Sequence, residues 1–126
     1  MLFINEQHQV FYGACIEKSN AKNDPYRKAL FYALGLTSET RNHIDSLYDF
    51  KERGINFDGL FQGWQTSTSV RATRLAFNLY NGFTGDVGDG RKDDMLQYTP
   101  EELFCDGLMM YFFEAVKLRY PENTRQ

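Results

Sequence analysis

Residues 64–74 hold the residue types best suited to binding an anion. A run of hydroxyls from Thr66 to Ser69 is followed by two arginines three positions apart, which share one face of a helix. Free backbone N–H groups at a helix start favour negative charge, and an indole can stack on a base. The pattern predicts a phosphate or nucleic-acid site formed by Trp64, Gln65, Thr66, Arg71 and Arg74.

The same residues also have a structural interpretation, which the sequence favours. The hydroxyls then cap the helix, Trp64 fills the core, and Arg71 and Arg74 pair with neighbouring carboxylates. Capping and ion pairing are common in helical domains, so the anion site stays the alternative.

No set of acid, base and nucleophile is visible, and we predict no catalytic residue. His43, beside Arg41 and Asp45, could act as a general base, and the only other histidine is His8. No nucleophile stands in a context that would activate it. An enzyme is therefore the least favoured class.

We also predict no metal and no cofactor. An EF-hand loop starting at Asp86 would place Gly88 third, Arg91 sixth and Gln97 twelfth, so the calcium pattern fails. Cys15 and Cys105 are isolated and are expected to be two buried thiols. Residues 84–94, rich in Gly and Asp, are expected to form a flexible surface loop.

Start and stop signals predict five or six helices. The first follows Asn5, the second spans about 25–34, the third runs from Thr37 or Ser38 to near Asp49, and the fourth ends at Asn81-Gly82. Thr99, Pro100 and Glu102 predict a capping box, with a break near residues 105–107 and a last helix ending before Pro121. Residues 50–63 should form an irregular connection, and no segment alternates long enough to predict a strand.

Length and composition predict one compact all-α domain over residues 1–126. The chain is 42% hydrophobic and 16% aromatic, which predicts an aromatic-rich core dominated by the fourth and last helices. The net charge of -3 gives no global attraction to nucleic acid or anionic lipid. The first residues lack the pattern of a signal peptide and no long apolar run occurs, so we expect a cytoplasmic protein without membrane contact.

Three groups of adjacent aromatic residues indicate a contact surface. Residues 11–12, 31–32 and 111–113 each place neighbouring rings about 100° apart on a helix, so that one ring can face the core and another its edge. Exposed Tyr and Phe are enriched at protein interfaces, which favours protein binding or self-association.

Several segments resemble a known family. These are residues 63–67 (GWQTS), 74–83 (RLAFNLYNGF) and 111–121 (YFFEAVKLRYP), together with 28–32 and 48–50. They are similar to a family of short bacterial proteins of unknown function that also occurs in phages and mobile elements. The resemblance covers nearly the whole chain and implies a genomic setting, but no reaction, cofactor or catalytic residue.

The expected function is therefore a non-enzymatic interaction module. The resemblance suggests a phage or mobile-element accessory or counter-defence protein that binds a host protein. The alternative is a phosphate- or nucleic-acid-binding protein that uses residues 64–74.

Overall fold

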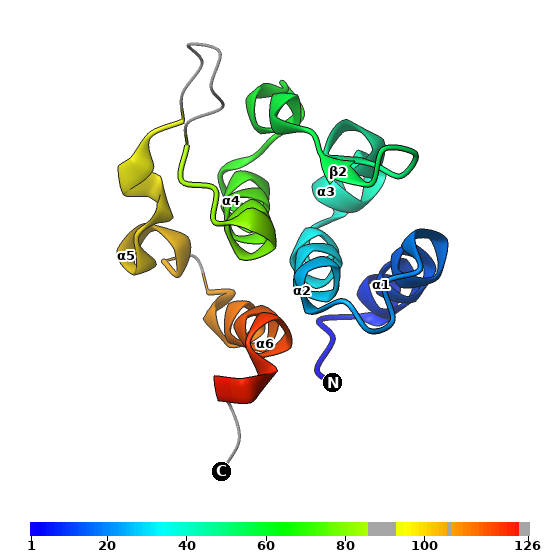
Figure 1. Cartoon of the computed structure of the whole chain (residues 1–126). Coiled ribbons are helices and arrows are strands. Elements are labelled where there is room, and N and C mark those ends of the chain that lie inside the picture. Colours follow the sequence, from blue (N-terminus) through cyan, green and yellow to red (C-terminus); the bar gives the residue numbers. More distant parts are fainter. Residues whose placement is uncertain (86–92, 106, 124–126) are drawn as a thin grey trace.

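The computed structural model of the chain describes all residues except 86–92, 106 and 124–126. The described part has six α-helices, two very short strands and four 3₁₀ helices (Figure 1). The helices are α1 (Glu6–Ser19), α2 (Pro25–Leu34), α3 (Ser38–Asn42), α4 (Ser67–Asn81), α5 (Pro100–Leu103) and α6 (Met109–Arg119). The strands are β1 (Tyr48–Asp49) and β2 (Gly54–Ile55), and the 3₁₀ helices are η1 (Ile44–Ser46), η2 (Phe57–Phe61), η3 (Met95–Tyr98) and η4 (Pro121–Asn123). The expectation of a mainly helical fold is confirmed.

Helix α2 is the centre of the fold. It lies between α1, α4 and α6, and every residue from Ala29 to Leu34 is fully buried (Figure 1). This six-residue run has no charged side chain, so all faces of the helix are apolar and need cover. The fourth and last helices were expected to dominate the core, but the helix with the longest fully buried run is α2.

The core is rich in aromatic residues, as expected. Its largest fully buried side chains include Phe31, Tyr32, Tyr48, Phe77 and Phe112. Phe31 contacts Tyr48 edge-on, with ring centroids 4.9 Å apart. Such edge-to-face contacts add about 0.5–1.5 kcal/mol per pair to the stability that burial supplies.

Most predicted helix ends are correct. Asn5 accepts a hydrogen bond from the His8 backbone N–H at 2.8 Å, and Asp24 accepts from two first-turn N–H groups of α2. Helix α4 ends at Gly82, whose φ of 78° lies in the left-handed region that glycine adopts without steric cost. These ends depend on side chains adjacent in sequence, which is why they can be predicted locally.

The predicted third helix is wrong beyond Asn42. Helix α3 stops there, the short η1 follows, and Tyr48–Asp49 pairs antiparallel with Gly54–Ile55 where no strand was expected. Tertiary contacts explain the difference, since Leu47 and Tyr48 are both buried and the Tyr48 hydroxyl accepts a 2.9 Å hydrogen bond from Arg27.

The predicted capping box at Thr99 is also wrong, although a helix does begin at Pro100. The Thr99 side chain does not cap α5; its hydroxyl donates to the Leu96 carbonyl at 3.0 Å. Thr99 directly follows the 3₁₀ helix η3, and its hydroxyl bonds to a carbonyl of η3 instead of to the N–H groups of α5.

Thr99→Ala should therefore change stability little. An exposed hydrogen bond to a neighbouring carbonyl is replaceable by water, so we expect a loss of at most about 0.5 kcal/mol. Urea denaturation checks this expectation through the midpoint at constant slope. A loss near the 1 kcal/mol or so typical of an N-cap would show that Thr99 caps α5 in solution.

The two cysteines lie in different environments. Cys15 is buried, as predicted, whereas Cys105 is exposed, so the expectation of two buried thiols is wrong. Cys105 lies two residues after the end of the short α5, where the chain turns at the surface before α6. Of the predicted loop at 84–94, residues 86–92, with Asp86 and Asp89, lie outside the described residues, as does Asp106.

None of the helices in the described part of the chain is both long and apolar enough to cross a lipid bilayer. Within the same residues, no cluster of three or more His, Cys, Asp or Glu side chains could hold a metal ion.

Candidate functional site

The structure places the five predicted binding residues at the start and along the first half of α4, with Trp64 partly buried. The Trp64 indole stacks on the His43 imidazole, with ring centroids 4.3 Å apart and an angle of 4° between the planes. Its Nε1–H is buried and has no acceptor among the described residues. One face of the indole is therefore covered by His43, directly after α3, and is not free for a base.

Gln65 and Thr66 hold the helix start together. The Thr66 hydroxyl accepts from the Ser69 N–H at 3.0 Å, and the Ser69 hydroxyl lies 2.7 Å from the Thr66 N–H, which completes a capping box. The Gln65 amide donates to the Gly59 carbonyl and the Thr73 hydroxyl, and its oxygen accepts from Ser69 at 2.6 Å. This network fixes the connection that leads into α4.

Arg74 is held by a carboxylate from the predicted loop. Its guanidinium donates two hydrogen bonds to Asp93, at 2.7 and 3.0 Å, and both side chains are largely buried. Burial alone would raise the pKa of Asp93, but the hydrogen bonds from Arg74 and Tyr98 outweigh it and leave the pKa below its usual value. Arg71, one turn earlier, donates to the backbone carbonyls of Glu102 and Ser67.

The five residues thus form one neighbourhood whose polar atoms bond mainly to the protein itself. A phosphate at this place would compete with Asp93 for Arg74 and with the capping network for the backbone N–H groups. Phosphate binding by residues 64–74 remains a prediction, and the geometry supports their structural role more directly.

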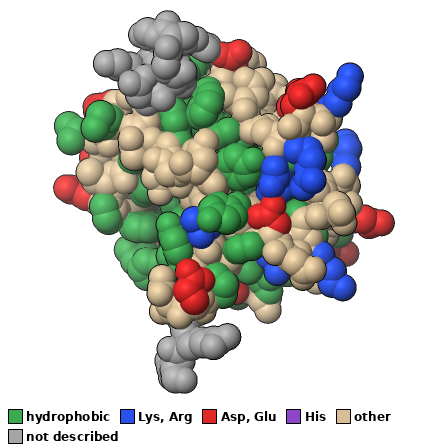
Figure 2. All heavy atoms as spheres, in the orientation of Figure 1, with side chains coloured by type: hydrophobic (Ala, Val, Ile, Leu, Met, Phe, Trp, Pro, Cys, Tyr) green, Lys and Arg blue, Asp and Glu red, His purple; other side chains and the backbone are tan. Residues whose placement is uncertain are grey.

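A different surface stands out along α6. Large apolar side chains are exposed there: Met109 at 45%, Met110 at 60% and Phe113 at 49%. In Figure 2, hydrophobic side chains gather on the side of the molecule that carries α5 and α6. We define the α6 surface as Met109, Met110, Phe113, Val116 and Lys117, which line an open hollow of about 630 Å³.

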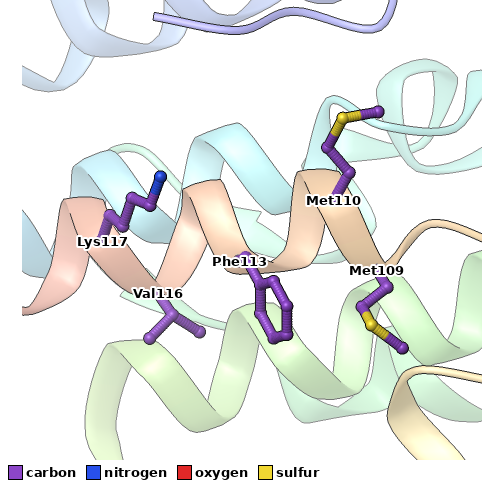
Figure 3. A pocket seen from close by; sticks show the side chains of 5 residues that line it. All are labelled: Met109, Met110, Phe113, Val116 and Lys117. Carbon is purple, nitrogen blue, oxygen red and sulfur yellow. The ribbon is translucent and has the colours of Figure 1, made fainter.

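Figure 3 shows how the side chains of the α6 surface are arranged. Met109, Phe113 and Val116 point to one side of the helix, and Met110 and Lys117 point to the other. The hollow therefore lies along the helix itself, with apolar walls and one ammonium group at its end. Lys117 keeps its charge exposed and pairs with Glu114 at 3.8 Å.

The origin of the α6 surface is visible in the sequence of the helix. Phe112 and Ala115 face the core and are fully buried, where α6 packs on α2 and α4. Three of the four exposed residues of α6 are also apolar, which is typical of a helix that is covered on more than one side. One ring of residues 111–113 was expected outside the core, and the exposed ring is that of Phe113, but the exposure of Met109 and Met110 was not predicted.

Comparison with known families matches residues 1–126 to DUF6075, a family of unknown function. The chain belongs to this family. Because the match spans the whole sequence, the DUF6075 residues include both the α6 surface and the network at the start of α4. Comparisons with curated proteins and with solved structures gave no match.

Proposed function

We propose that this DUF6075 protein is a non-enzymatic interaction module that binds another protein through the α6 surface. The observation that carries the proposal is the exposure of Met109, Met110 and Phe113 on a helix whose inner side is already packed. A partner that covers these side chains gains the free energy of burying their exposed apolar surface. Full burial of a fully exposed Met or Phe side chain contributes about 1.5–3 kcal/mol, so each half-exposed side chain here contributes part of that.

The residue types of the α6 surface suit protein recognition. Methionine is flexible and polarisable, so it adapts to the shape of a partner, and Met and Phe are enriched in the centre of protein interfaces. Lys117 at the end of the hollow adds a charge that can fix the orientation of the partner. The resemblance of the sequence to proteins of phages and mobile elements suggests a host protein as this partner, in an accessory or counter-defence role in the cytoplasm.

Site-specific photo-crosslinking tests the proposal. A photoreactive phenylalanine at position 113 should form a discrete adduct in cells that naturally express the protein, whereas the same group at the exposed Lys22 should not. Met110→Glu should reduce the adduct at position 113 about tenfold or more, because a carboxylate would have to be buried in the apolar contact. Its melting temperature should stay unchanged, since Met110 is mostly exposed.

Equal labelling at positions 113 and 22 would contradict the proposal. Light scattering of the purified protein tests whether the partner is a second copy of the chain. If it is, the wild type should be a dimer and Met110→Glu a monomer, and the interaction is self-association.

A further inference from the structure

Two neighbouring hollows lie between α1 and the α3–η1 segment, away from the residues of the α6 surface. The smaller, of about 220 Å³, is lined by Phe11, Ala14, Cys15, Lys18, Arg41, Ile44 and Phe50. The larger, of about 500 Å³, is lined by Glu6, Gln7, Val10, Phe11, Arg41 and Asn42. Phe11 and Arg41 belong to both, so the two hollows form one groove, which we name the α1–α3 groove.

The Arg41 guanidinium is the unusual group in this groove. It is partly buried, donates one hydrogen bond to the Gly35 carbonyl at 2.7 Å, and has no carboxylate within salt-bridge distance in the described part of the chain. Arg27 and Arg74, by contrast, each hold an aspartate at 2.7 Å. A partly buried guanidinium whose N–H groups are mostly free of protein partners can donate hydrogen bonds to a bound carboxylate.

The charge of Arg41 also acts on its surroundings. Burial lowers the pKa of His8, whose ring is fully enclosed, and the positive charge of Arg41 lowers it further. Glu39 acts on the charge of Arg41 and Glu6 lines the larger hollow, but neither forms an ion pair with Arg41. The charged residues that line the groove are thus two cations, Arg41 and Lys18, and one carboxylate, Glu6, which leaves an excess of positive charge.

The smaller hollow is apolar except at its rim. Phe11, Ala14, Ile44 and Phe50 supply hydrocarbon walls. Burial raises the pKa of the Cys15 thiol to about 12, so it is neutral and adds to the apolar wall. The Lys18 ammonium lies 4.3 Å from the centre of the Phe50 ring and provides a second cation at the rim.

We propose that the α1–α3 groove binds a small monocarboxylate with an apolar body, such as a short acyl chain. The carboxylate accepts hydrogen bonds from Arg41, and the apolar body fills the smaller hollow beside Phe11 and Phe50. The volume of the smaller hollow suits one short chain or ring, and charge complementarity selects an anion over a neutral molecule. This proposal is independent of protein binding at α6.

Octanoate is the probe, with octanol as its neutral counterpart and acetate as the anion without a tail. NMR titration of the labelled protein should show octanoate shifts at Ile44 and Phe50, with octanol and acetate at least about tenfold weaker. Ala14→Leu should abolish octanoate binding by filling the hollow from an exposed helix position, where leucine preserves the helix. Arg41→Gln should weaken binding about tenfold or more, whereas Lys117→Gln, the matched charge control on α6, should not change it.

Three outcomes would overturn the proposal. One is that octanoate causes no chemical-shift change at the groove residues at concentrations up to about 10 mM, which would mean an affinity too weak for a specific site. Another is equal binding of octanol and octanoate, which would leave Arg41 without a role. The third is binding to the groove only by an acidic peptide or by a second copy of the chain, which would make it a protein interface. Ala14→Leu keeps the test decisive if Arg41→Gln fails to fold.

Discussion

Replacing Leu75 by alanine should lower the free energy of unfolding by about 2–5 kcal/mol. Leu75 lies in the middle of α4, is 3% exposed and belongs to the continuous core that α4 forms with α2. The substitution removes buried methyl groups and leaves a cavity that the surrounding aromatic side chains fill only in part. Denaturant unfolding at constant slope measures the loss.

A matched control for Leu75→Ala lies on α6. Met110→Ala removes a side chain of similar size from a position that is 60% exposed, and it should cost no more than about 0.5 kcal/mol. Equal losses for the two variants would mean that Leu75 is not in the core or that the α6 surface is covered in the isolated protein.

Arg74→Ala should lower the free energy of unfolding by about 3 kcal/mol. Among the described residues, it would leave the largely buried Asp93 carboxylate with Tyr98 and a backbone N–H as donors. Lys117→Ala is the control, because the Lys117 side chain is mostly exposed in a 3.8 Å ion pair, and surface pairs contribute at most about 1 kcal/mol. A similar loss of unfolding free energy for both variants would show that burial of the Arg74–Asp93 pair does not make it more important for stability than an exposed pair.

The same pair predicts the acid sensitivity of the protein. The pKa of Asp93 is lower in the folded than in the unfolded protein, so its contribution to stability is complete above the ordinary value of about 4 and is lost as the pH falls through the folded value. Wild type and Arg74→Ala should therefore converge in stability under strongly acidic conditions. Parallel curves down to that range would contradict the role given to Asp93.

The predicted phosphate site is tested with a double variant, Arg71→Ala with Arg74→Ala. If residues 64–74 bind phosphate, this change should weaken nucleotide or oligonucleotide binding, and wild-type affinity should fall as salt rises. Trp64, the only tryptophan, reports both binding and unfolding by its fluorescence. The phosphate site is contradicted if neither the wild type nor the double variant changes its fluorescence on adding nucleotide. If the double variant is also less stable, the two arginines have a structural role alone.

The sequence determined the helical class and most helix boundaries of this protein. Asn5, Asp24, Thr66 and Gly82 act on backbone groups within a few residues, so their effect can be derived from neighbours in the chain. The sequence did not single out the apolar run in α2 as a buried helix, since one ring of residues 31–32 was expected at the edge of the core and both are fully buried. Only the tertiary structure decided that this helix is the centre of the fold, because that place depends on which helices meet it.

Tertiary structure also decided which candidate residues remain available to a ligand. Asp93 lies 19 positions from Arg74, and no local spacing indicates that the two form a buried pair. Met109 and Phe113 have the same apolar character as the buried Phe112, so periodicity alone could not tell which side of α6 stays outside. Arg41 resembles any surface arginine in sequence, and only the structure shows that it bonds the Gly35 carbonyl and has no carboxylate within salt-bridge distance in the described part of the chain. Burial and pairing depend on contacts between distant segments, which is why the fold was predictable and the candidate surfaces were not.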